Sequence, residues 1–119
     1  APDELIVGVE VPDDVPAIQE FAKVGVRNAM VIATVSCLVM RGDDGFRIAF
    51  GSVAPTPIRA RRTEAMLNEA THITGEVLDR VAAMVAGEVR PITDHRSTAA
   101  YRTHAAGVLA RRLVERCLA

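Results

Sequence analysis

The sequence predicts an α+β domain in which a small antiparallel sheet of three to four strands precedes, and packs against, about three helices. Two observations carry this prediction. Strand-like alternation of apolar and polar residues is confined to the first half of the chain, before Pro55, and helical spacing of apolar residues follows Pro57. The length of 119 residues suits a single domain, residues 1–119, with one hydrophobic core.

Two strands are predicted before residue 25. Leu5–Val11 alternates, because every second residue is a large aliphatic one, and Pro12 ends the pattern. Ala17–Val24 forms the second strand and places Phe21 and Lys23 on the same face, since side chains two residues apart point the same way.

A hairpin is predicted next. Val31–Met40 is an almost unbroken apolar run, so we expect a central strand that is buried on both faces. The turn Arg41–Gly45 contains two Gly and two Asp residues, and Phe46–Gly51 alternates again as a half-buried strand. These two strands form the hairpin.

Three helices are predicted in the second half. The first is a short helix over Arg61–Asn68. The second is capped by Thr74, carries an apolar stripe up to Val89 and ends before Pro91. The third starts near Ser97 or Thr98. Its expected apolar face is Tyr101, Ala105, Val108, Leu109, Leu113 and Cys117, and its expected polar face is Arg102, Arg111, Glu115 and Arg116.

Composition excludes several classes of partner. The net charge is -1 and aromatic residues make up 3% of the chain, which disfavours binding to nucleic acids. No apolar run is long enough to span a bilayer. Cys37 and Cys117 lie far apart without the spacing of a zinc or iron–sulfur site, so we expect two reduced thiols in a cytoplasmic protein.

The histidines and the basic cluster have simple interpretations. His72, His95 and His104 have no carboxylate or second histidine at ligand spacing, and we expect solvated or capping side chains. Arg59, together with the arginine pair at 61 and 62, is either a solvated helix start or a patch that contacts phosphate or an acidic partner surface. Arginines oppose the dipole at a helix start, which favours docking.

Two further motifs are interpreted as structural. The Arg41-Gly42-Asp43 tripeptide resembles a cell-adhesion signal, but a hairpin turn needs these residue types anyway. Asp94 precedes the last helix and can cap it or pair with Arg96 and Arg102, which would lock that helix onto the preceding turn.

Lys23 is the only lysine in the chain. On a strand beside Phe21 it can place a positive charge near a bound anion. The alternative is a surface lysine whose aliphatic stem lies along the sheet while its amine stays in water.

Two long motifs resemble one known family. Gly51–Leu67 reads GSVAPTPIRARRTEAML and Pro91–Arg112 reads PITDHRSTAAYRTHAAGVLARR. With Glu4–Ile6 and Phe21–Arg27, they resemble the C-terminal domain of the FAD-binding subunit of molybdenum hydroxylases. That family includes carbon monoxide dehydrogenase medium chains and xanthine dehydrogenase FAD subunits, and the resemblance spans essentially the whole chain.

The resemblance implies a shared FAD site. It places Ile6 against the isoalloxazine ring and Lys23 beside it, and Arg27 at the start of a loop near the flavin edge. A cation at Lys23 would favour the negative charge that flavin gains on reduction. No GxGxxG segment is present to cradle the pyrophosphate, so two further domains would supply it. We therefore expect that the 119-residue chain alone does not retain FAD.

The resemblance also implies partners. These are an iron–sulfur subunit that carries the clusters and a molybdenum subunit that carries the molybdenum cofactor, and the present chain would break no bond itself. One departure stands out, because Val31 lies where the family often has Asp. The alternative to a flavin-subunit domain is a stand-alone α+β interaction module without a cofactor.

Overall fold

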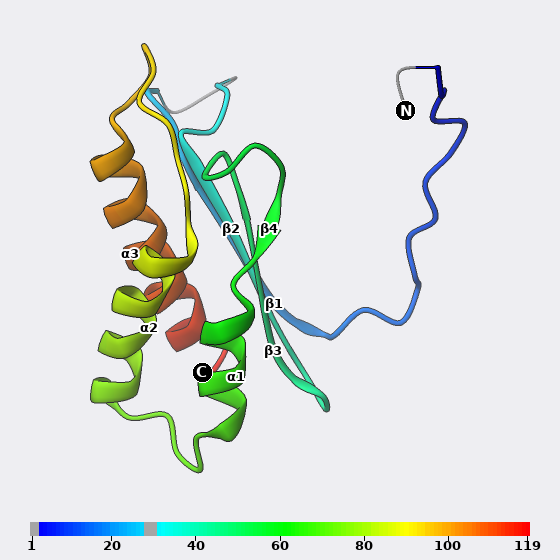
Figure 1. Cartoon of the computed structure of the whole chain (residues 1–119). Coiled ribbons are helices and arrows are strands. Elements are labelled where there is room, and N and C mark those ends of the chain that lie inside the picture. Colours follow the sequence, from blue (N-terminus) through cyan, green and yellow to red (C-terminus); the bar gives the residue numbers. More distant parts are fainter. Residues whose placement is uncertain (1–2, 28–30) are drawn as a thin grey trace.

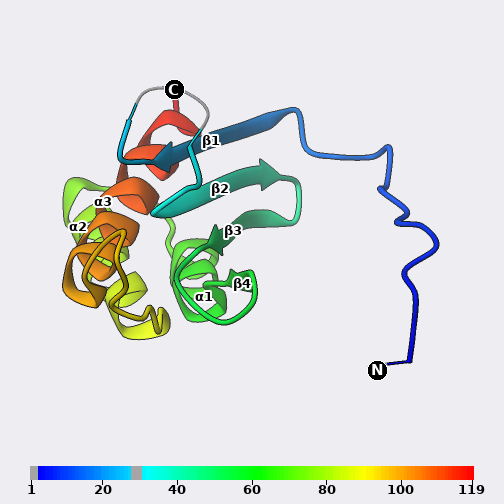
Figure 2. The ribbon, with the colours of Figure 1, turned by 90° about the horizontal axis from the view of Figure 1, so that it is seen from above.

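The computed structural model describes residues 3–27 and 31–119 and has two layers, a four-stranded antiparallel sheet and a layer of helices (Figure 1). Seen from above, the helices cover one face of the sheet and leave the other uncovered (Figure 2). The predicted α+β class and the order of strands before helices are confirmed. The elements are β1 (Ile18–Val24), β2 (Val35–Gly42), β3 (Gly45–Gly51), β4 (Ile58–Arg59), α1 (Arg61–Glu69), α2 (Gly75–Glu88) and α3 (Ala99–Arg116).

The predicted hairpin is the centre of the sheet. The strand order is β1-β2-β3-β4, and Gly42 pairs with Gly45 across a two-residue turn at the β2–β3 junction. Gly45 has a φ of +99°, and a Cβ there would collide with Asn68. Phe46 and Phe50 are buried, as the alternation predicts.

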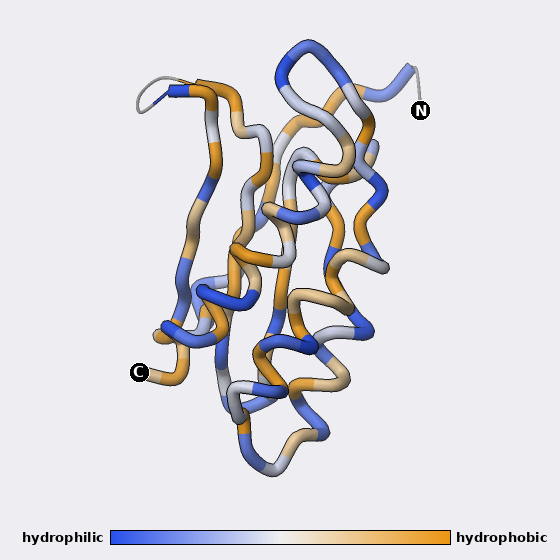
Figure 3. The backbone as a smooth tube through the Cα atoms, turned by 90° about the vertical axis from the view of Figure 1, so that its left-hand side faces the viewer, coloured by the Kyte–Doolittle hydropathy of each residue, from blue (hydrophilic) through white to orange (hydrophobic). Residues whose placement is uncertain are grey.

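The core lies between the helices and one face of the sheet. Val39 and Ile48 of the sheet are fully buried in this core, and so are Val85 of α2 and Val114 of α3. Each such side chain contributes about 1.5–3 kcal/mol by leaving water. Hydrophobic and hydrophilic segments alternate along the helices, which is the amphipathic pattern that a one-sided core requires (Figure 3).

The helix starts are capped in two ways. Thr74 accepts a hydrogen bond from the Val77 amide in α2, and Thr98 accepts one from the Tyr101 amide in α3, as a Thr cap should. α1 has no side-chain cap of its own. Instead the Glu88 carboxylate, from the end of α2, accepts the Thr63 amide at 2.9 Å and the Thr63 hydroxyl at 2.6 Å. This carboxylate joins α1 to α2.

Several boundaries and faces differ from the sequence prediction. β2 begins at Val35 rather than Val31, and only its helix side is fully buried, because nothing in the described chain covers the other face. On α3, Tyr101 is 49% exposed and Arg102 is 2% exposed, the reverse of the predicted faces. Burial of Arg102 is possible because its charge and two of its nitrogens are satisfied by partners described below.

The predicted first strand is wrong for this structure. Leu5–Val11 pairs with no strand in the described chain and belongs to an extended segment, residues 3–17, which we call the N-terminal arm. Figures 1 and 2 both show the arm leading away from the sheet. A strand needs a neighbour for its amides and carbonyls, and the alternating pattern alone cannot provide one.

The uncovered side of the sheet, which we call the open face, has an apolar centre. It consists of alternate residues of the three long strands, and its main members are Phe21, Lys23, Ser36, Leu38, Met40 and Ala49. Phe21 is 61% exposed. An antiparallel sheet can leave one face in water, but that face is then usually polar.

Close packing of α2 on α3 gives a first prediction. A Cβ on Gly107 of α3 would lie 2.7 Å from the Ala82 carbonyl oxygen of α2. We expect Gly107→Ala to lower the free energy of unfolding by about 1–3 kcal/mol, because backbone must move to admit the methyl group. Denaturant unfolding would measure it.

Gly87→Ala is the matched control, since a Cβ there meets nothing within 4 Å. In an exposed helical position the same change should stabilise the protein by about 0.5–1 kcal/mol. Equal effects of the two substitutions would contradict the described helix contact.

Candidate functional site

Lys23 lies on β1 at the edge of the open face. It pairs with Ser36 of β2, and its side chain is exposed on the same side as Phe21, while Ala22 points toward the core. The Lys23 ammonium donates a hydrogen bond to the Val31 carbonyl oxygen at 3.2 Å. A cation therefore stands at one end of an apolar surface, and it donates to a neutral carbonyl.

Val31 lies beside Lys23 without opposing its charge. The ideal Cβ position of Gly25 is 2.3 Å from the Val31 Cγ1, so the Val31 side chain packs directly against the Gly25 backbone. An Asp at this position, as the family often has, would bring a carboxylate into the neighbourhood of the ammonium. The loop expected to begin at Arg27 continues through residues 28–30, which lie outside the described residues.

The structure does not bring Ile6 to Lys23. Ile6 is 85% exposed on the N-terminal arm, and in Figures 1 and 2 the arm leaves from the start of β1, whereas Lys23 is near its end. The expected wall formed jointly by these two residues is therefore absent from the described chain. Contact of either residue with a flavin stays a prediction.

A buried ionic cluster joins the last helix to the sheet. The Arg102 guanidinium donates to the Asp94 carboxylate at 2.7 Å, to the Thr34 carbonyl at 2.8 Å and to the Ser52 carbonyl at 3.0 Å. Arg96 also donates to Asp94, at 2.9 Å. These groups are called the Arg102 cluster below, and they confirm the predicted locking role of Asp94.

The cluster sets the ionisation of Asp94. Partial burial alone would raise the pKa of this carboxyl group. Hydrogen bonds from the Arg96 amide, from the two guanidinium groups and from the Ser97 amide outweigh burial and hold the pKa well below its ordinary value. Asp94 therefore remains a carboxylate and balances the buried charge of Arg102.

The cluster also fixes the end of the sheet that carries Lys23. Arg102 holds the carbonyl of Thr34, which immediately precedes β2, and that of Ser52, which follows β3. The Thr34 amide in turn donates to the Val24 carbonyl of β1 at 2.7 Å. The Arg102 guanidinium therefore connects the ends of β2 and β3 directly and the end of β1 through Thr34. Lys23 is the residue before Val24, so it lies at this connected end of the sheet.

The basic cluster at α1 is divided. Arg59 pairs with the buried Glu64 carboxylate through two hydrogen bonds of 3.0 and 2.7 Å, and Glu64 also accepts the Ile48 amide. Arg59 therefore completes the sheet edge rather than a docking patch. Arg61 and Arg62 keep exposed side chains.

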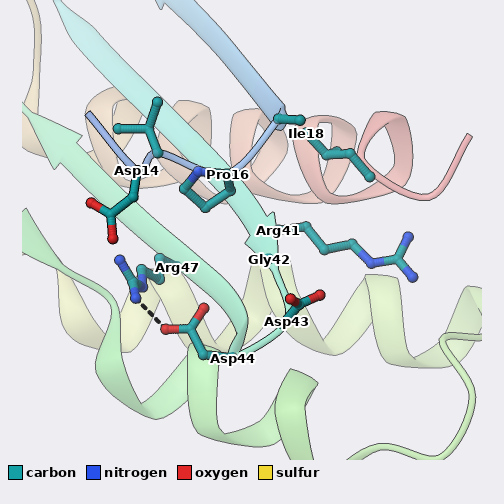
Figure 4. A pocket seen from close by; sticks show the side chains of 10 residues that line it. Asp14, Pro16, Ile18, Arg41, Gly42, Asp43, Asp44 and Arg47 are labelled. Atoms are coloured by element: carbon teal, nitrogen blue, oxygen red, sulfur yellow. Dashed lines mark hydrogen bonds and ion pairs between the residues drawn. The ribbon is translucent and has the colours of Figure 1, made fainter. Parts of the chain in front are cut away.

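A hollow lies between the arm and the hairpin tip (Figure 4). Its volume is about 720 Å³, and Asp14, Arg41 and Arg47 line it. Arg47 pairs with Asp44, and Arg41 donates to the Cys117 carbonyl, so the charges are used internally. The Arg41-Gly42-Asp43 tripeptide is accordingly part of the hairpin and its contact with α3.

The remaining candidate groups form no site. His72, His95 and His104 are exposed, as expected. Among the described residues, no group of His, Cys, Asp and Glu is suited to hold a metal ion. Both thiols are free and buried, and burial raises the pKa of Cys37 to about 12, which makes it unreactive. No helix in the described ranges has the length and apolarity needed to cross a membrane.

Sequence comparison agrees with the resemblance drawn from the motifs. Residues 20–117 match the family model of the CO dehydrogenase flavoprotein C-terminal domain. A putative xanthine dehydrogenase FAD-binding subunit of Escherichia coli is 29% identical over 98% of the chain. The chain spans only 42% of the length of that relative.

Solved structures share the fold. A carbon monoxide dehydrogenase from Hydrogenophaga pseudoflava superposes with a TM-score of 0.76 at 28% identity, covering 86% of this chain and 37% of that one. CO dehydrogenase from Oligotropha carboxidovorans gives a TM-score of 0.71 at 28% identity, covering 83% and 36%. Quinoline 2-oxidoreductase from Pseudomonas putida, at 21% identity, covers 87% and 38% with a TM-score of 0.73 and shows the fold alone.

The Arg102 cluster gives the second prediction. Asp94→Asn removes the charge that balances Arg102, so we expect a clear loss of unfolding free energy at pH 7. The folded pKa of Asp94 lies below that of an unfolded aspartate, about 3.9. The wild-type stabilisation is therefore present above that value and is lost as the pH falls from there through the folded pKa.

Asp79→Asn is the control, because Asp79 is mostly exposed where it pairs with Arg111. Unfolding curves at several pH values would measure the decrease in unfolding free energy on acidification. This decrease should be smaller in Asp94→Asn than in wild type, and it should be unchanged in Asp79→Asn. Identical pH profiles for wild type and Asp94→Asn would rule out this role of the cluster.

Proposed function

Because the chain belongs to the CO dehydrogenase flavoprotein C-terminal domain family, we propose that it closes one side of the FAD site in the flavin subunit of a molybdenum hydroxylase. In the same proposal it docks to the iron–sulfur and molybdenum subunits while electrons pass between them. The observation that carries the proposal is the open face, where Lys23 stands at the end of an apolar surface that the helices do not cover.

The residues of the open face fit one wall of a flavin site. An isoalloxazine ring is flat and aromatic and becomes negatively charged on reduction, so it suits an apolar surface with a cation at its end. Phe21 supplies exposed apolar area and Lys23 supplies the charge. The pyrophosphate needs a glycine-rich cradle that this sequence lacks, so the other walls come from elsewhere in the flavin subunit.

In this proposal the cofactor and the protein have separate roles. Bound FAD would supply the redox chemistry, receiving electrons and passing them to an acceptor. Lys23 would hold a fixed positive charge beside the ring, and Phe21 would exclude water from that side. Val31 leaves the charge of Lys23 unopposed at a position where the family often places a carboxylate. None of these roles requires a bond to be made or broken by this chain.

Docking to the partner subunits is assigned to surfaces outside the core. Arg61 and Arg62 have exposed side chains at the start of α1, where the Glu88 carboxylate already satisfies the helix amides. They are therefore not needed to complete the fold and can contact acidic groups of a neighbour. We expect the substrate site itself to lie in the molybdenum subunit.

Flavin retention tests the proposal. The 119-residue chain purified alone should carry no stoichiometric FAD, because it lacks a pyrophosphate cradle. The intact flavin subunit should carry one FAD. Absorbance near the flavin bands, compared with protein concentration, measures both. An intact subunit that never binds FAD would support a stand-alone interaction module instead.

The charge of Lys23 gives a sharper test in the intact subunit. Lys23→Ala should lower the flavin midpoint potential, because a cation that stabilises the reduced cofactor is lost. The shift should be roughly 20 mV for each kcal/mol of attraction removed from a two-electron couple. Redox titration followed by absorbance would measure it.

Two variants serve as controls for the titration. Lys23→Arg should keep most of the potential because it keeps the charge. Arg112→Ala removes an exposed cation on α3, in the layer opposite the open face, and should leave the potential unchanged. If Lys23→Ala behaves like Arg112→Ala, the flavin role of Lys23 is refuted and the lysine is an ordinary surface residue.

A further inference from the structure

The N-terminal arm carries a strand pattern without a strand partner. Within residues 5–11, five large aliphatic side chains are between 75% and 94% exposed, and Gly8 has no atom of another segment within 4 Å of its ideal Cβ position. Those five residues are Leu5, Ile6, Val7, Val9 and Val11.

Exposing this much apolar surface to water costs free energy, and the composition of the segment differs from that of a flexible linker. A linker that stays in water is poor in β-branched and aliphatic residues, whereas this segment is rich in them. Burying each side chain against another surface would stabilise the strand, because apolar area would leave water. The aliphatic row at every second position suits one buried face of a β-strand, and Pro12 and Pro16 stop the strand from continuing into β1.

The comparisons indicate where the partner lies. The C-terminal domain family begins at residue 20, after the arm, whereas similarity to the FAD-binding subunit of Escherichia coli extends over 98% of the chain. The arm therefore resembles part of a flavin subunit but not part of the C-terminal domain. More than half of that relative's length lies outside the matched part, which leaves room for another sheet.

We propose that residues 5–11 form a β-strand on the edge of a β-sheet in the flavin-binding part of the subunit, with the aliphatic row Leu5, Val7, Val9 and Val11 buried against that part. This proposal rests on the proposed function. The added strand would satisfy its own amides and carbonyls and would bind by main-chain hydrogen bonds and side-chain burial together. Ile6 and the side-chain-free Gly8 would then share the opposite face.

The same strand would couple the two domains. Residues 12–17 connect it directly to β1, which carries Phe21 and Lys23. If the strand is fixed on the flavin-binding part, residues 12–17 limit the distance between that part and the open face. The arm is thus a positioning element for the flavin wall.

Amide hydrogen exchange tests the pairing. In the 119-residue chain, the amides of residues 5–11 should exchange at nearly the rate of unfolded peptide. In the intact, FAD-loaded flavin subunit they should exchange at least about 100-fold more slowly, because a paired strand must open first. Equal fast exchange in both would overturn the proposal. Protection already present in the 119-residue chain would also overturn it, since the arm would then fold onto its own β1.

Two substitutions provide an independent readout. Val7→Asp should leave thermal unfolding of the 119-residue chain unchanged, because Val7 is exposed there, but should abolish protection of residues 5–11 in the subunit. Val15→Asp, on the arm but outside the alternating segment, should leave that protection in place. If both variants lose amide protection to a similar extent, residues 5–11 do not form a specific strand.

The flavin content of the wild-type subunit separates the two proposals. A subunit that binds FAD but shows no protection of residues 5–11 would refute the strand and leave the proposed function standing. A subunit with a protected arm and no FAD would refute the proposed function, and with it the assignment of the partner as a flavin-binding part.

Discussion

The buried guanidinium of Arg102 is the interaction on which the arrangement of this domain depends. A charge with 2% exposure is costly unless it is paired and hydrogen-bonded. Asp94 supplies the opposite charge, and the carbonyls of Thr34 and Ser52 supply acceptors from the ends of two different strands. Removing any partner leaves a buried polar group unsatisfied, so the last helix, the preceding loop and the sheet are held in one relative position.

This constraint acts at the Lys23 end of the sheet. The bond between Thr34 and Val24 passes the constraint from β2 to β1. The helices cover the other face, and they are joined to one another by the Glu88 carboxylate at the start of α1. The strands that form the open face are therefore held to the last helix at the end that carries Lys23. Under the proposed function, this connection would hold the open face in place against a planar cofactor that another domain binds.

Much of the fold could be predicted from the sequence because the signals were local. Thr74 and Thr98 mark helix starts by their side-chain chemistry, and the Gly-rich turn after Met40 marks the hairpin. Burial of Arg102 and exposure of Tyr101 could not be predicted in this way. The helical pattern ranks residues by polarity, whereas the burial of Arg102 depends on acceptors 68 and 50 residues away in sequence.

The candidate site was predicted only in part for a similar reason. Lys23 and Phe21 share a face because alternation within one strand is local. Ile6 was expected beside them, but it lies on the exposed arm, which pairs with no strand of the described chain. Glu64 and Glu88 were missed as well, since each acts on an element distant in sequence, and an acidic residue near a cluster of arginines was the one signal that could have pointed to Glu64.

An experimental structure of the native, FAD-loaded assembly would show whether the open face forms a wall of the flavin site. The quantity to measure is the distance from the Lys23 Nζ to the nearest atom of the isoalloxazine ring. We predict a distance within about 6 Å, the range over which an opposite charge acts strongly. A Lys23 ammonium in open solvent, with the flavin ring against a different surface of the domain or not against this domain, would rule out this role of the open face.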